Sequence, residues 1–137
     1  MSAPAASLAS KLQSPNLEER RRTVEELARN PASAVPVSVA LVQATADDDD
    51  NVRQWATSAL EDMGPPASGD CQALAELLAG NQADPAYWAA TLLGRLGQSA
   101  SPAANCLTKA AQAHGTPAVR RRAAWDLEQM QGTREAK

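Results

Sequence analysis

Apolar residues recur along this chain at the spacing of one face of an α-helix. The clearest example runs from 49 to 63, where apolar positions lie three or four residues apart: Val52, Trp55, Ala56, Ala59, Leu60 and Met63. The strict apolar–polar alternation of half-buried strands is absent, and β-branched and aromatic residues are sparse. The pattern therefore predicts helices along the whole chain.

Helix start signals divide this pattern into segments. Asp49 precedes one apolar stripe. Each of three other stripes is preceded by a residue with a hydrogen-bond acceptor in its side chain and then a proline: Ser14-Pro15, Asp84-Pro85 and Thr116-Pro117. Proline suits the first helical position because its missing N–H has no partner there in any case. We expect helices at about 4–13, 15–29, 34–46, 49–63, 68–79, 85–96, 101–113 and 117–130.

The pattern repeats with a period of 33 residues. The stretch NVRQWATSALEDMG at 51–64 returns as DPAYWAATLLGRLG at 84–97. The same period places four leucines in phase, which are Leu8, Leu41, Leu74 and Leu107. A second series of Leu27, Leu60 and Leu93 continues to Asp126 beside Leu127, a slip of one residue.

Helix pairs of this length cannot bury their apolar faces alone, so neighbouring pairs must stack. The sequence therefore predicts an all-α fold, namely a right-handed α-solenoid of about three helix pairs with a half repeat at each end. With 137 residues we expect a single domain over 1–137.

Composition limits the possible partners. Hydrophobic residues make up 44% of the chain, but Phe is absent and much of the apolar total is Ala, so helices must approach closely through small side chains. Lys and Arg number 13 against 16 Asp and Glu, and a net charge of −3 gives no general attraction to nucleic acid or anionic membranes. The N-terminal MSAPAASLASKLQS does not resemble a signal peptide and no run is long enough to span a membrane, so we expect a cytoplasmic protein.

The stretch DDDDNVRQWATSALEDMG at 47–64 resembles the HEAT-like repeat of bacterial and phycobilisome-lyase-type proteins, with an acidic turn, a Val-Arg pair, a small residue, Ala-Leu and a closing Gly. TPAVRRRAAWDLEQM at 116–130 repeats part of it, whereas the first and third copies lack Val-Arg. Proteins that look like this serve as adaptors, scaffolds, chromophore-lyase subunits and nucleic-acid binders.

In such repeats the arginine after valine reaches the acidic turn of an adjacent unit. The resemblance implies that Arg53 and Arg120 pair with acids such as Asp47, Asp49 or Asp84, and that this ladder is broken in the first and third copies.

The charged runs have structural explanations. The four aspartates at 47–50 lack the spacing of a calcium loop, so we expect Asp49 to cap the next helix. The arginine runs at 20–22 and 120–122 are interleaved with acids, which predicts solvated ion pairs four residues apart and makes nucleic-acid binding an unfavoured alternative. These pairs are Glu18–Arg22, Arg21–Glu25, Arg22–Glu26 and Arg122–Asp126.

No catalytic, metal-binding or cofactor-binding constellation is present in the sequence. His114 is the single histidine, and Cys71 and Cys106 lack ligand spacing, so we expect two reduced, buried thiols and a protein that is not an enzyme. Trp55 and Trp88 are expected to pack against the following unit. Trp125 lies off their position and is expected to be exposed, as a docking edge.

A partner would lie on the second helix of each pair, two residues before and after the phase-locked leucines. The predicted partner-binding residues are Val39, Gln43, Gln72, Glu76, Asn105 and Lys109, with Trp125. The leading hypothesis is a protein-interaction scaffold or adaptor whose partner is an unidentified protein or peptide. The alternatives are an accessory subunit of a chromophore (bilin) lyase and a nucleic-acid-binding protein.

Overall fold

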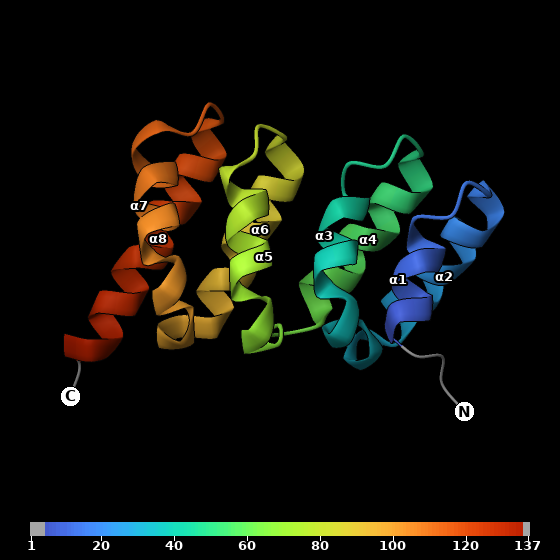
Figure 1. Ribbon diagram of the computed structural model, residues 1–137, viewed down its shortest axis with the longest axis horizontal. Coiled ribbons are helices and arrows are strands. Elements are labelled where there is room, and N and C mark those ends of the chain that lie inside the picture. The colour runs from blue at the N-terminus through green and yellow to red at the C-terminus, as the bar shows by residue number, and fades with distance from the viewer. Residues whose placement is uncertain (1–4, 136–137) are drawn as a thin grey trace. The chain divides into compact units, whose positions relative to one another are not determined.

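The computed structural model describes residues 5–135, with side chains described for 7–130. These residues form helices and connecting turns without a strand, as the periodicity predicted (Figure 1). The α-helices are α1 Ala5–Leu12, α2 Leu17–Arg29, α3 Ser38–Ala44, α4 Asp50–Asp62, α5 Cys71–Ala79, α6 Ala83–Leu96, α7 Ala104–Ala113 and α8 Pro117–Glu135.

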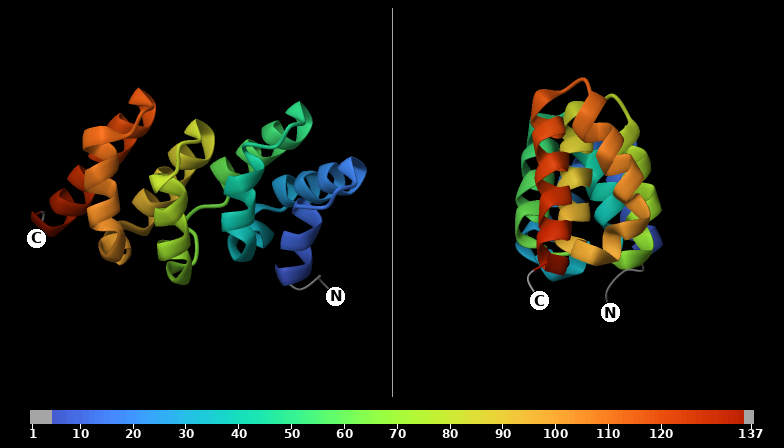
Figure 2. Two further views of the ribbon diagram at one scale, coloured as in Figure 1. Left: turned by 45° about the horizontal axis from the view of Figure 1, so that its top comes forward. Right: turned by 90° about the vertical axis from the view of Figure 1, so that its left-hand side faces the viewer.

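The chain divides into two compact units, unit 1 at Met1–Gly64 and unit 2 at Pro65–Lys137. Within unit 1, α2 packs against both α1 and α4, and α3 packs against α1 and α4. Within unit 2, α6 packs against α5 and α8, and α7 packs against α5 and α8 (Figures 1 and 2). In each unit the helices therefore form pairs and the pairs pack against one another, which confirms the predicted all-α repeat fold.

The second helix of each pair begins differently from the prediction. The segments expected to start α-helices at 34, 68 and 101 contain 3-10 turns instead, at Pro31–Val37, Ser68–Asp70 and Gly97–Ala103. Pro36 and Pro102 lie inside two of these turns and have no N–H to donate, so the regular α-helical bonds begin only two residues later. The leucine-bearing helices are correspondingly shorter than expected.

Helix caps confirm one prediction and correct two. The Asp49 side chain accepts from the Val52 N–H at 3.0 Å, as expected. The cap of α2 is Asn16, whose Oδ1 accepts from the N–H of Glu18 at 2.9 Å, whereas Ser14 had been expected there. Helix α6 begins at Ala83 after Gln82, without a side-chain cap, so Asp84 is not its cap.

The core of each unit contains the phase-locked leucines. Leu41, Leu74 and Leu107 are fully buried, as predicted, and Leu8 is half-buried. We call α2, α4, α6 and α8 the outer helices. Several of their alanines are also fully buried, including Ala56, Ala59, Ala89 and Ala90. Since alanine keeps two helix backbones close together, this packing accounts for the chain's preference for small apolar residues.

One arginine bond recurs in both units. In each case Nη1 donates to the main-chain carbonyl six residues earlier, in the turn that follows the preceding helix: Arg20 to Ser14 at 2.8 Å, Arg53 to Asp47 at 2.6 Å and Arg120 to His114 at 2.6 Å. Carbonyls beyond a helix end have no helical partner, so the guanidinium satisfies a group that would otherwise lack one. The bond fixes where each outer helix starts relative to the helix before it.

These bonds correct the arginine pairing expected from the repeat resemblance. Arg53 reaches the carbonyl of Asp47 and pairs with Asp50, and Arg120 reaches a carbonyl rather than Asp84. The first copy, expected to break the ladder, keeps it because Arg20 also pairs with Asp47 at 2.9 Å. The third copy has Ala86 at this position, so the break predicted there is present.

Replacing Arg20 with Met is expected to lower the free energy of unfolding by about 1–3 kcal/mol, because the carbonyl of Ser14 and the mostly buried Asp47 carboxylate lose a charged donor. The matched control is Arg29→Met in the same helix, since the Arg29 side chain is 71% exposed and pairs with Glu25. That change is expected to cost at most about 0.5 kcal/mol in urea unfolding. Equal losses for the two variants would contradict the structural role of Arg20.

Candidate partner-binding surfaces

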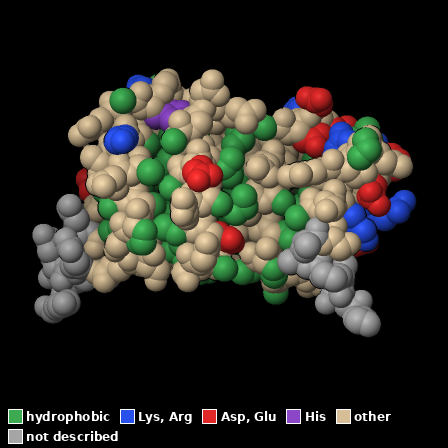
Figure 3. Space-filling view, viewed as in Figure 1, with side chains coloured by type: hydrophobic (Ala, Val, Ile, Leu, Met, Phe, Trp, Pro, Cys, Tyr) green, Lys and Arg blue, Asp and Glu red, His purple; other side chains and the backbone are tan. Residues whose placement is uncertain are grey.

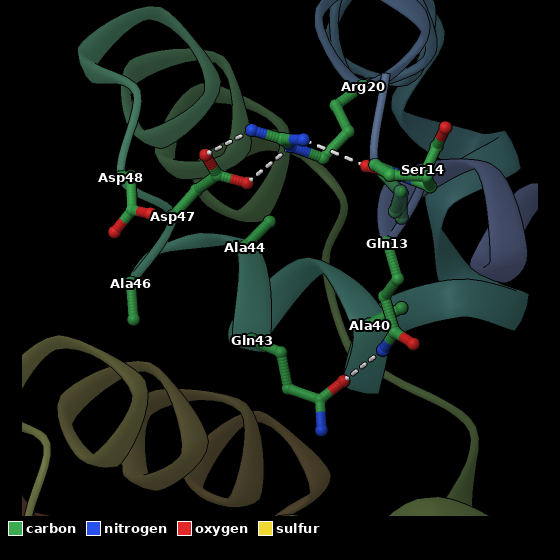
Figure 4. A pocket seen from close by; sticks show the side chains of 11 residues that line it. Gln13, Ser14, Arg20, Ala40, Gln43, Ala44, Ala46, Asp47 and Asp48 are labelled. Carbon is green, nitrogen blue, oxygen red and sulfur yellow. Dashed lines mark hydrogen bonds and ion pairs between the residues drawn. The ribbon is translucent and has the colours of Figure 1, made fainter. Parts of the chain in front are cut away.

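A pocket of about 400 Å³ opens in unit 1 beside the ends of α1 and α3 (Figure 4). Its walls come from the end of α1, from α3 and from the turn that leads to α4, and Arg20 of α2 closes one side. The lining residues are Leu12, Gln13, Ser14, Pro15, Arg20, Ala40, Gln43, Ala44, Ala46, Asp47 and Asp48. The pocket is lined mostly by polar and small side chains, so it suits a group that forms hydrogen bonds better than a large apolar side chain.

Two glutamine side chains meet at this pocket. The Gln13 Nε2 donates to the Gln43 Oε1 at 2.9 Å, and Figure 4 shows the pair on one side of the opening. A primary amide has two donor hydrogens and an acceptor oxygen, so the bond leaves further hydrogen-bonding capacity on both residues. Gln43 was predicted to bind a partner and is exposed here, whereas Val39, one turn earlier, is half-buried.

At the other side of the pocket, the aspartates of the acidic turn form ion pairs and hydrogen bonds within the protein. Asp47 accepts from the Arg20 guanidinium and from the N–H of Asp49 at 3.0 Å, and Asp49 pairs with Arg21 at 2.8 Å. The hydrogen bond from Arg21 lowers the pKa of Asp49 to about 2. Asp48 is exposed. The described residues contain no group of three His, Cys, Asp or Glu side chains placed to hold a metal ion.

The ion pairs of α2 differ from the pairs four residues apart that the sequence predicted. Arg21 pairs with Glu18 at 3.3 Å and with Asp49 of the next turn, not with Glu25. Glu25 instead pairs with Arg29 at 2.6 Å. Arg21 therefore links two successive outer helices, a contact that spacing along one helix does not reveal.

In unit 2 the predicted partner-binding residues lie on two neighbouring helices. Gln72 and Glu76 on α5, and Asn105 and Lys109 on α7, are all exposed, and α5 contacts α7. Acidic and basic side chains are few over α5 and α7 in Figure 3, whereas they gather over α2 of unit 1. Unit 2 therefore presents a surface of amides and small side chains with a single charge on each helix.

Trp125 on α8 is 47% exposed, as expected, and is the exposed large apolar residue of the described chain. The Arg122 guanidinium carbon lies 4.6 Å from its ring centre, a cation–π contact. Trp55 and Trp88 are half-buried, and Trp88 makes an edge contact with Tyr87 at 5.9 Å between ring centres. Arg122 follows Arg120 by two residues, as Trp55 follows Arg53, so an arginine replaces the tryptophan in the last repeat.

Asp126 is the residue that sequence reasoning misjudged. It was expected in a solvated ion pair, but it is fully buried, and neither carboxylate oxygen has a hydrogen-bond partner among the described residues. Arg122 Nε lies 3.3 Å from Oδ1. Burial raises the pKa of Asp126 to about 7, and Arg122 opposes that shift. A signal was present in the sequence, since Asp126 lies directly before Leu127, which continues the series of Leu27, Leu60 and Leu93 after the slip of one residue.

Gly94 makes room for this carboxyl group. A Cβ added at Gly94 on α6 would overlap the Asp126 carboxylate of α8. Relative to the bonding arginines, Asp126 occupies the place of Ala59, since each lies six residues after its arginine. The corresponding residues of the first and third copies are Glu26 and Leu92, so the position is not restricted to alanine, and in unit 2 the missing side chain of Gly94 leaves room for the carboxylate.

The histidine and the cysteines have structural surroundings. The His114 Nδ1 accepts from the Thr116 N–H at 3.0 Å, so Nε2 carries the proton and donates to the carbonyl of Gly80 at 3.0 Å. Cys71 is buried, and burial raises the pKa of its thiol. Cys106 is half-buried rather than buried as expected. His114 thus ties together two turns of unit 2.

Comparisons with known proteins support the repeat fold. Residues 5–93 match a family model described as HEAT repeats. The crystal structure of an engineered protein is similar with a TM-score of 0.56 and 19% sequence identity, over 94% of this chain, which spans 63% of that chain. A search of curated proteins found no match. Among the described residues, no helix has the length and apolar character needed to cross a membrane.

The contact between Gly94 and Asp126 predicts that alanine is tolerated far less well at Gly94 than at another glycine of the same unit. Gly94→Ala is expected to lower the free energy of unfolding by roughly 2–4 kcal/mol, because the added methyl group overlaps the fully buried Asp126 carboxyl group and one of the two must be displaced. Gly69→Ala, where an added Cβ meets nothing within 4 Å, is the control and should change stability little.

The double variant Gly94→Ala/Asp126→Ala separates this clash from other effects of the substitution. It should recover the lost stability, since the overlap disappears and alanine favours a helix by about 1 kcal/mol over glycine. Thermal unfolding monitored by circular dichroism measures all three variants. A double variant as unstable as Gly94→Ala would show that the clash is not with the carboxylate.

Proposed function

The chain belongs to the HEAT repeat family, and we propose that it is a non-enzymatic protein-interaction module, with one candidate binding face on α1 and α3 of unit 1 and another on α5 and α7 of unit 2. One observation carries the proposal, which is the scarcity of charge on α1, α3, α5 and α7. Helix α3 has no charged residue, and α1, α5 and α7 have one each, namely Lys11, Glu76 and Lys109. Helix α2, LEERRRTVEELAR, is mostly charged, α4 has four charged residues and α6 has two.

Depletion of charge is the compositional mark of interface cores, because a charged side chain loses hydration when a partner covers it. On α2 the charges are used within the protein, as in the pairs of Arg20 with Asp47 and Arg21 with Asp49. Covering the α5–α7 face of unit 2 would desolvate few ions. This difference supports binding there rather than on the outer helices.

Side-chain amides indicate the chemistry of the partner. Gln13 and Gln43 are exposed in unit 1, and Gln72 and Asn105 are exposed in unit 2. Each amide offers donors and an acceptor, the same pair of functions that a peptide main chain presents. Neither face offers an aromatic anchor among these residues, so an extended peptide segment of a partner protein, bound through its main chain, fits them best.

The same reasoning weakens the nucleic-acid alternative. Of the two arginine runs, Arg20 and Arg21 are paired with aspartates, Arg120 donates to a carbonyl and Arg122 lies against Asp126. Phosphate binding would require these guanidinium groups to leave their present partners. We also propose a cytoplasmic location, where Cys71 and Cys106 would remain thiols.

The accessory-subunit alternative, in which the chain assists a chromophore lyase, rests on the resemblance of the repeats alone. We expect the absorbance spectrum of a free bilin to stay unchanged when the purified protein is added in excess, because two pockets of unit 1 are lined mainly by polar, charged and small residues. A shifted and intensified bilin band that depends on protein concentration would instead favour the lyase-related function.

Site-specific photo-cross-linking tests the proposed binding face. A photoreactive residue placed at Gln72 or Asn105 should yield adducts with one partner protein in lysate of the native host, because both side chains are exposed on the charge-poor face. The same residue at Glu26 or Arg29, exposed on α2, is the control and should yield few adducts.

The cross-linked partner is then purified for a binding measurement. Gln72→Arg should weaken its binding about tenfold or more, since a buried unpaired charge is costly, whereas Glu26→Arg should leave binding unchanged. Adducts obtained from the α2 positions alone, or binding that Gln72→Arg leaves intact, would contradict the assignment of the face.

A further inference from the structure

The contact between α6 and α8 in unit 2 contains a carboxyl group in an apolar setting. Asp126 is fully buried, and the core residues of α6 and α8 include Leu92, Leu93 and Ala123, each with no exposed surface. Gly94 lies directly against the carboxylate. An ionised carboxylate without hydrogen-bond donors is costly to bury, whereas its protonated form is much less so.

The charged groups around Asp126 come from few elements. On α8 itself, Arg122 Nε lies 3.3 Å from Oδ1 and has no hydrogen-bond partner among the described residues. On α6, Arg95 is directed over the Trp88 ring at 6.0 Å. On α7, the charged residue is Lys109, which is exposed, and the 3-10 turn Gly97–Ala103 contains no charged residue. Arg122 is therefore the cation that acts on Asp126.

Arg122 is shared between two contacts. Its guanidinium lies over the Trp125 ring at 4.6 Å while its Nε faces Asp126. A neutral Asp126 leaves Arg122 free to remain on the exposed tryptophan, and an ionised Asp126 draws the cation toward the α6–α8 contact. The ionisation state of one buried group is thus coupled to the packing of the helix that carries Trp125.

We propose that α8 is a pH-responsive element of unit 2, which packs tightly on α6 while Asp126 carries a proton and loosens when that carboxyl group is ionised. The device is independent of any partner and would operate in the isolated protein.

The direction of the pH effect on α8 follows from the linkage between protonation of Asp126 and packing of the helix. The pKa of Asp126 is about 7 with α8 packed, and it returns to about 3.8 when opening exposes the group to water. A carboxyl group with a raised pKa contributes its full stabilisation below the lower value, loses it as pH rises, and changes no further above the higher value. Between about pH 5 and pH 8 the fraction of opened α8 is expected to rise roughly 10- to 100-fold.

Amide hydrogen exchange of the full chain measures this opening. Protection of the α8 amides, corrected for intrinsic exchange and compared with that of α4 amides, should fall at least about tenfold between pH 5 and pH 8. In Asp126→Asn, which keeps the shape of the side chain but cannot ionise, this pH dependence should disappear. Asp48→Asn removes an exposed carboxylate of unit 1 and should leave it as in the unaltered protein.

The carboxyl carbon signal of Asp126 provides a second measurement that needs no core variant. NMR titration should show Asp126 changing near neutral pH. An Asp126 midpoint within about half a unit of 3.8, the value for an exposed aspartate, or α8 protection that follows α4 at every pH, would overturn the proposal.

Discussion

The arrangement of successive helices depends on one interaction, the hydrogen bond from an arginine guanidinium to a main-chain carbonyl in the preceding turn. A helix ends with carbonyls that no further turn of the same helix can satisfy. Arg20, Arg53 and Arg120 each donate to such a turn, at 2.8, 2.6 and 2.6 Å. A charged donor holds the turn against the first turns of the following helix, and alanines one turn after two of these arginines, Ala56 and Ala123, are completely buried. Helix α6, which has Ala86 at the arginine position, packs without this bond.

The sequence predicted what depends on side-chain periodicity. The helices, the capping role of Asp49, and the burial of Leu41, Leu74 and Leu107 follow from apolar spacing and turn chemistry. The acceptor of the arginine bond could not be predicted, since a main-chain carbonyl has no residue type. For the same reason the first copy was taken to lack the bond. Glu19 stands where the pattern has valine, but the bond needs only Arg20 and a turn.

The last repeat shows what periodicity alone overlooks. Charge pairs four residues apart are usually solvated, so Arg122 and Asp126 looked like a surface pair. Their surroundings decide otherwise, because Gly94 on the facing helix admits the carboxylate to a position that is fully buried. Arg122, at the tryptophan position of the repeat, and Asp126 give α8 a polar buried contact, and the same arginine lies over the exposed Trp125 ring. The outer helices thus use their charges in structure, and the helices between them keep faces with little charge.

The arginine bonds themselves are the most direct object of measurement. In low-temperature NMR spectra of arginine-labelled protein, assigned with single Arg→Lys variants, the guanidinium protons of Arg20, Arg53 and Arg120 should give resolved signals with slowed rotation and exchange. Arg29, whose side chain is 71% exposed, should give an averaged signal. Averaged signals from Arg20, Arg53 and Arg120 as well would show that their guanidinium groups move freely in solvent, and would contradict the account of how the repeats are held in register.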